Sequence, residues 1–182
     1  MASPDKQRSD TLTGAEAAVD MLKSHGVEIL FGLCGDTSLP FYDALARLPH
    51  GMRHVLTRDE RSASYMADGY ARVSGKVGVC EGPSGGGATY ILPGLAEANE
   101  SSVPLLCINS DISVAARGRY TLTELDQSAL MRPSRSLVSN SVGLCSAAFW
   151  KSVRARRWTS GSMFSMEKFL LAIVRKIEEM RL

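Results

Sequence analysis

The chain has 182 residues, of which 45% are hydrophobic and 22% charged, and its formal net charge is +2. These are ordinary values for a globular protein, and the small net charge gives no general sign of binding to nucleic acid or to an anionic membrane. No apolar run reaches the roughly 18 residues of a membrane span, and the polar start MASPDKQRSDTL has no apolar signal-peptide core. The four cysteines are scattered without a CxxC pair, so we expect reduced thiols and a cytoplasmic α/β domain.

Helical and strand-like segments alternate from residue 13 onward. Thr13 and Glu16 have the spacing of a capping box, and the helix that follows should end at Gly26. Further helices are predicted over 39–48, over 59–73 with an end near Gly75, and over 85–101, where Pro93 should interrupt the helix. Between the helices lie four short apolar segments typical of buried strands: 27–33, 53–57, 76–82 and 103–109.

This order of elements predicts the fold class, an α/β protein with a parallel sheet covered by helices on both faces. Ligands of such sheets bind at the carboxyl ends of the strands. We therefore expect one ligand site, built by the four loops that follow the strands: GLCGDTS, TRDE, EGPSGGG and NSDIS.

Each loop also has a simpler interpretation. The glycine-rich segment 82–89 could hold a phosphate at a helix start, but it fits neither GxGxxG nor GxxxxGK[ST], and a tight turn explains it equally well. Asp36, Thr37 or Ser38 is expected to cap the helix that follows. Glu60 stands in the first turn of its helix, where the dipole favours any carboxylate, so a solvated charge is the usual case.

Four stretches together resemble the N-terminal, pyrimidine-binding domain of thiamine diphosphate-dependent enzymes of the acetolactate synthase and benzaldehyde lyase group. They are GAEAAVDMLKSHGVEILFGLCGDTSLPFYDAL, TRDERSASYMADGYARVSGKVGV, GPSGGGATYILPGLAEANESSVPLLCI and TELDQSALMRP. The resemblance implies a polar N-terminal tail over 1–10, a pyrimidine-binding domain over 11–133 and a divergent basic tail with a C-terminal helix over 134–182.

The resemblance implies a catalytic role for Glu60. In these enzymes the matching glutamate hydrogen-bonds ring nitrogen N1′ of the aminopyrimidine and favours the tautomer that removes the proton from thiazolium C2. A carboxyl group in this role should lie in a fairly dry pocket, because burial raises its pKa and lets it share a proton near neutrality. Pro83 and Gly87 match cofactor-binding positions that pack on the pyrimidine ring.

The substrate side of the implied site matches the family only in part. The first loop, which faces the reacting end of the cofactor, matches at three residues: Gly35, Asp36 and Thr37. Thr123 stands in the place of a common active-site glutamine, and Tyr90 stands where asparagine is common. The common His-Glu-Gln is Asp-Glu-Arg over 59–61. These departures leave the role of Glu60 intact and leave the substrate open.

The family anchors the diphosphate and its Mg²⁺ through a GDG…N motif in a second α/β domain, and this sequence lacks that motif. We therefore expect thiamine diphosphate to be bound here at its pyrimidine end, with Mg²⁺ held by a domain absent from this chain. The partner would be another copy in a homo-oligomer or a chain that carries the diphosphate-binding domain. The resemblance implies lyase or transferase chemistry, carboligation or decarboxylation of a 2-keto acid or aldehyde, and assigns no use of FAD.

Two alternatives stay open from the sequence. The loss of family character near Ser134 favours a catalytically silent, truncated fragment that acts as a folded dimerisation or binding module. The basic residues near the end of the chain could instead contact nucleic acid or an acidic partner, although a solvated face is the commoner explanation. These basic residues are Arg135, Lys151, Arg154, Arg156 and Arg157. We expect neither nucleic acid nor a membrane as partner.

Overall fold

The computed structural model of the protein describes residues 12–132 and 141–145. Its core is a parallel sheet with the strand order β2-β1-β3-β4-β5. The strands are β1 (Ile29–Gly32), β2 (Arg53–Leu56), β3 (Gly78–Gly82), β4 (Leu105–Asn109) and β5 (Ser141–Cys145). The four strands expected from the sequence are confirmed, and a fifth is added to them.

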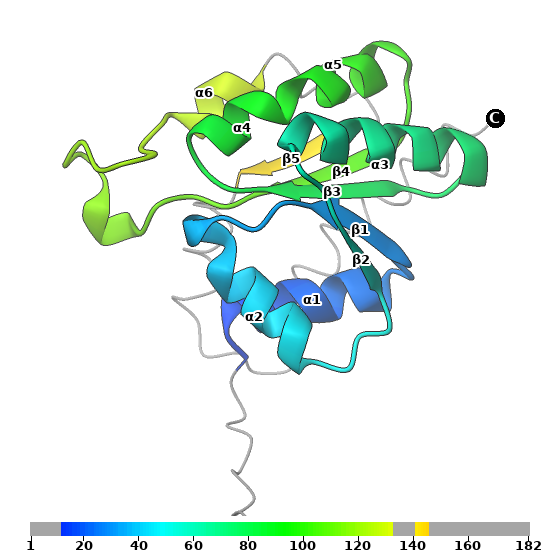
Figure 1. Ribbon diagram of the computed structural model, residues 1–182, viewed down its shortest axis with the longest axis horizontal. Helices are drawn as coiled ribbons and strands as arrows, with labels where there is room; N and C mark the ends of the chain where they lie inside the picture. The colour runs from blue at the N-terminus through cyan, green and yellow to red at the C-terminus, as the bar shows by residue number, and fades with distance from the viewer. Residues whose placement is uncertain (1–11, 133–140, 146–182) are drawn as a thin grey trace, which may run out of the picture.

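Helices cover both faces of the sheet, as the fold class predicts (Figure 1). One face carries α1 (Gly14–Ser24) and α2 (Leu39–Arg47), and the other carries α3 (Glu60–Ser74), α4 (Gly86–Tyr90), α5 (Leu92–Glu100) and α6 (Gln127–Met131). Two short 3-10 helices, η1 (Asp36–Ser38) and η2 (Val114–Ala116), lie in the loops after β1 and β4. Among the helices of the described residues, none is long and apolar enough to cross a membrane.

Local signals set most of the helix ends. Thr13 and Glu16 form the predicted capping box of α1. Gly75 ends α3 with a left-handed φ of 67°, a conformation that glycine adopts at no steric cost. The interruption expected at Pro93 separates α4 from α5. The expected cap of α2 is wrong, because Ser38 occupies the N-cap position without a side-chain cap bond.

The core forms two layers, one on each face of the sheet. Successive strand residues face opposite sides, so Val79 packs with α1 and α2 while Cys80 packs with α3 and α5. Small residues allow helices α3 and α5 to pack close together. A Cβ atom on Gly94 of α5 would lie 2.6 Å from the Cβ of Ser64 on α3.

The fifth strand was not expected from the sequence. Residues 141–145 pair in parallel with β4, from Leu105↔Ser141 to Asn109↔Cys145. The sheet therefore continues beyond residue 133, while the predicted domain boundary there stays a prediction. The helix expected near the C-terminus lies outside the described residues, as does the N-terminal tail over 1–10.

Candidate functional site

The site lies where the chain changes direction within the sheet. From β1 the chain passes to β2 on one side, and from β2 it crosses to β3 on the other. After β1 and after β3 the chain continues to helices on opposite faces of the sheet, and ligands of open α/β sheets bind at such a point, at the carboxyl ends of the strands. In Figure 1 the loops after β1, β3 and β4 gather at the left end of the view.

The first and third loops contact each other directly. The backbone N–H of Ser84 donates to the hydroxyl oxygen of Thr37 at 3.0 Å. A Cβ atom on Gly35 would lie 2.6 Å from the Cβ of Pro83, so only glycine allows this approach. Asp36, by contrast, is exposed in η1. Gly35, Thr37 and Pro83 thus lie together as predicted, whereas Asp36 is exposed.

Glu60 is the first residue of α3 and directly follows Asp59, the residue that caps the helix. Asp59 caps the helix by accepting a hydrogen bond from the backbone N–H of Arg61 at 2.8 Å. The Glu60 side chain turns inward and is only 9% exposed. Among the residues that the structure describes, none forms a hydrogen bond or ion pair with its carboxylate. A largely buried side chain whose carboxylate has no protein partner is a candidate ligand-binding group.

Glu60 meets the two residues predicted to pack on the cofactor ring. A Cβ atom on Gly87 would lie 3.1 Å from Glu60 Oε1 and 2.6 Å from Pro83 Cγ. Gly82 lies beneath the same carboxyl group, since its Cβ position is 3.6 Å from Glu60 Cγ. Helix α3, the loop after β3 and the start of α4 therefore converge on one carboxylate oxygen. The absence of a side chain on Gly87 lets the Pro83 ring and that oxygen pack closely against its backbone.

Thr123 lies beside the third loop in a strained conformation. Its φ is 69°, in the left-handed region that is unusual for a β-branched residue. Ser84 Oγ donates to Thr123 Oγ1 at 2.7 Å, and a Cβ atom on Gly85 would lie 2.7 Å from the Cβ of Thr123. Such a backbone costs on the order of 1–3 kcal/mol and persists where surrounding contacts impose it, often at functional sites.

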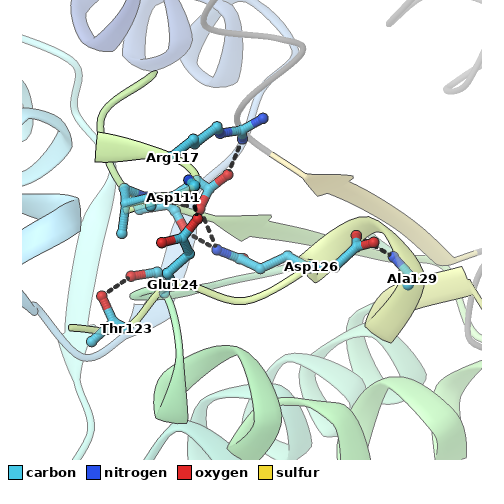
Figure 2. Close-up of polar contacts among 11 residues, drawn as sticks. Asp111, Arg117, Thr123, Glu124, Asp126 and Ala129 are labelled. Carbon is cyan, nitrogen blue, oxygen red and sulfur yellow. Dashed lines mark hydrogen bonds and ion pairs between the residues drawn. The ribbon is translucent and has the colours of Figure 1, made fainter. Parts of the chain in front are cut away.

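Polar contacts in the segment after β4 impose the position of Thr123 (Figure 2). Arg117 forms an ion pair with Asp111. The carboxylate of Glu124 accepts a hydrogen bond from the backbone N–H of Gly118 at 2.5 Å. This backbone hydrogen bond is the main reason why the pKa of Glu124 is below its ordinary value. Contacts between its own residues therefore hold the segment from Asp111 to Glu124, which contains Thr123.

Two departures from the family pattern contact each other. The guanidinium of Arg61 lies over the ring of Tyr90, 5.5 Å from its centroid, which is within cation–π distance. The same guanidinium pairs with Asp59 at 2.7 Å and lowers the pKa of that carboxyl group to about 2. The residues that replace the common ones beside Glu60 therefore form one connected group at the start of α3.

Glu81 is a buried carboxyl group that the sequence analysis missed. It lies on β3 and is fully buried, and burial raises its pKa to about 8. A single acidic residue inside an otherwise apolar strand was the available signal. In the described part of the chain, no group of three or more His, Cys, Asp or Glu side chains is placed to hold a metal ion.

The fold is that of a doubly wound, parallel α/β domain, with a candidate ligand site at its switch point. The family described as "Thiamine pyrophosphate enzyme, N-terminal TPP binding domain" matches residues 12–130, and the chain belongs to this family. The resemblance stated from the sequence is confirmed.

Among curated proteins, the chain is similar to acetolactate synthases. It is 44% identical over 122 residues to the "Probable acetolactate synthase large subunit" of Methanococcus aeolicus, covering 67% of this chain and 20% of that protein. It is 44% identical over 123 residues to the "Acetolactate synthase" of Arthrospira platensis, covering 66% and 21%. The "Acetolactate synthase large subunit" of Parasynechococcus marenigrum is 42% identical over 124 residues. The chain thus spans about a fifth of the length of the relatives it matches.

Proposed function

We propose that this chain binds the aminopyrimidine ring of thiamine diphosphate and supplies one half of a composite active site. The observation that carries the proposal is the carboxylate of Glu60, which is 9% exposed and has no partner among the described residues. Glu60, Pro83 and Gly87 lie together at this end of the sheet, and in the proposal they contact the ring and its basic nitrogen. A protonated ring nitrogen would supply the hydrogen bond that the Glu60 carboxylate lacks within the described residues.

Each residue of the half-site has a distinct role in this proposal. Glu60 shares a proton with ring nitrogen N1′, while Pro83 and the bare backbone of Gly87 hold the ring in place. The loop with Gly35 and Thr37 closes the reacting end and restricts water. When bound, thiamine diphosphate supplies the nucleophilic carbon that adds to the carbonyl group of a 2-keto acid or an aldehyde.

The diphosphate, its Mg²⁺ and the other half of the site come, in this proposal, from a partner. The relatives are several times longer than the matched region, and no metal-binding cluster was found among the described residues. The partner is another chain that carries the diphosphate-binding domain, or a further copy in an oligomer. The expected reaction is an acetolactate synthase-like carboligation or decarboxylation in the cytoplasm.

The test measures binding of thiamine diphosphate with Mg²⁺ by calorimetry, with the full chain alone and mixed with a candidate diphosphate-binding chain. We expect measurable binding in the mixture and a loss of at least about tenfold in Glu60→Gln, since one charge-assisted hydrogen bond is worth about 1.5–3 kcal/mol. Glu100→Gln, an exposed glutamate on α5, is the control. Exchange of the C2 proton of the bound cofactor should slow in Glu60→Gln, and an unchanged exchange rate would refute the role of Glu60.

A second pair of variants tests the ring surface. Gly87→Ala places a methyl group 2.6 Å from Pro83 Cγ and 3.1 Å from Glu60 Oε1, so it should abolish binding. The neighbouring Gly86→Ala meets no atom within 4 Å and should bind as the wild type does. Equal affinities of the two variants would show that the ring binds elsewhere.

A further inference from the structure

Glu81 has no role in the proposed function, yet it lies directly beneath the site. It follows Cys80 on β3, so its side chain points to the opposite face of the sheet, toward α2. It is 0% exposed. Tyr42, Ser38 and Ser110 surround its carboxyl group and partly offset the effect of burial on its pKa.

Space for this buried group comes from a glycine on the neighbouring strand. Gly32 pairs with Glu81 in the register of β1 and β3. A Cβ atom on Gly32 would lie 2.5 Å from the hydroxyl oxygen of Tyr42 and 3.2 Å from Glu81 Oε2. Within the described residues, neither carboxyl oxygen of Glu81 nor the hydroxyl of Tyr42 has a hydrogen-bond partner of good geometry. The side chains of Glu81 and Tyr42 therefore form a buried polar pair between the sheet and α2.

Among the described residues, no positively charged group compensates Glu81. The titratable groups that interact electrostatically with it are Tyr42 on α2, Cys34 before η1, Glu60 on α3 and, on the opposite face of the sheet, Cys107 of β4. His54 of β2 packs against the Tyr42 ring at 5.0 Å between centroids. Burial lowers the pKa of His54, which disfavours a positive charge on this ring. The negative charge of Glu60 further disfavours ionisation of Glu81.

We propose that Glu81 is a positioning residue that, as a neutral carboxylic acid, holds the loop 33–38 closed over the substrate side of the site. Ser38 links the two, because it lies beside the carboxyl group and its Oγ accepts from the backbone N–H of Gly35 at 3.0 Å and donates to the carbonyl of Gly35 at 3.1 Å. An ionised Glu81 needs water, since a buried charge without a counter-charge is costly. Cys34 and Asp36 of that loop are exposed, and Cys34 interacts electrostatically with Glu81, so in this proposal water reaches Glu81 when the loop opens. The effect on the cofactor rests on the proposed function.

The direction of the pH dependence follows from the two states. With the loop closed, the pKa of Glu81 is raised from 4.5 to about 8, and with the loop open, water restores it toward 4.5. The closed state is therefore fully favoured below the open-state pKa. It loses about tenfold in its equilibrium constant for each pH unit until the closed-state pKa is passed.

Amide hydrogen exchange of the full chain tests this role without any ligand. After correction for intrinsic exchange, protection of the Gly35 and Ser38 amides should fall about tenfold per pH unit between about pH 5 and 8. Glu81→Gln should abolish the slope, and Glu100→Gln should keep it. A flat profile in the wild type, or an unchanged slope in Glu81→Gln, would overturn the proposal. Should Glu81→Gln not fold, ¹³C titration of Glu81 in the wild type decides, and a midpoint near the ordinary value contradicts the proposal.

Measuring thiamine diphosphate binding at several pH values distinguishes a failure of this inference from a failure of the proposed function. Thiamine diphosphate affinity, measured from pH 6 to 8 with the partner chain, should fall more steeply in the wild type than in Glu81→Gln. A wild-type mixture that binds no thiamine diphosphate at any pH contradicts the proposed function, and the exchange slope then still decides the role of Glu81. Binding with the same pH profile in both proteins contradicts the role of Glu81 alone.

Discussion

Replacing Glu81 by glutamine should change how the stability of the whole domain depends on pH. Glutamine has nearly the same shape and keeps polar atoms beside Tyr42 and Ser38, but it does not titrate. Any constant cost of burying the amide shifts the free energy of unfolding equally at all pH values. The difference in slope between the two proteins therefore reports the ionisation of Glu81 alone.

The magnitude follows from the pKa of Glu81 in the two states. Burial raises it from 4.5 to about 8 in the folded chain. Between these values the unfolded chain has released the proton and the folded chain still binds it, so stability falls by about 1.4 kcal/mol per pH unit. From pH 4.5 to pH 7 the loss amounts to about 3 kcal/mol. This is a large part of the free energy of unfolding of a typical domain, which is about 5–15 kcal/mol.

Urea unfolding at several pH values between 4.5 and 9 measures this effect. We expect the stability of Glu81→Gln relative to the wild type to rise by about 3 kcal/mol from pH 4.5 to pH 7 and to level off above about pH 8. Equal m-values in both proteins are needed for this comparison. Parallel stability curves would show that Glu81 ionises normally in the folded chain, and the reasoning from burial would be wrong.

Two further predictions concern the α3 region. Gly94→Ala places a methyl group 2.4 Å from the hydroxyl oxygen of Ser64, and we expect urea unfolding to show a loss of about 1–3 kcal/mol. Gly69→Ala meets no atom within 4 Å and should be neutral or stabilising, by up to about 1 kcal/mol; an equal loss in both would contradict the close helix approach. Asp59 should titrate at about pH 2 by NMR, and its stabilising effect, present above the ordinary value of 3.8, should be lost as the pH falls toward 2. Arg61→Gln should raise this pKa toward 3.8, and an unchanged midpoint would show that the ion pair is not its cause.

Features fixed by neighbouring residues were predicted well. The helix from Glu60 to Ser74 has its signals within a few residues, a capping carboxylate at Asp59 and a left-handed glycine at Gly75. The break at Pro93 has the same local origin, because proline lacks the backbone N–H and clashes with the preceding turn. The side-chain cap expected for α2 is absent because the Ser38 hydroxyl forms its hydrogen bonds with the backbone N–H and carbonyl of Gly35.

The sequence by itself determined the alternation of helices and strands, and hence a parallel sheet with a site at the strand ends. It also indicated the family, through motifs that the comparison confirmed over residues 12–130. Only the tertiary structure placed Glu60, Pro83 and Gly87 around one surface, buried Glu81 beneath the first loop and added β5 to the sheet. Strand pairing and the burial of a charge depend on partners distant in sequence, whereas helix caps and turns depend on the residues next to them.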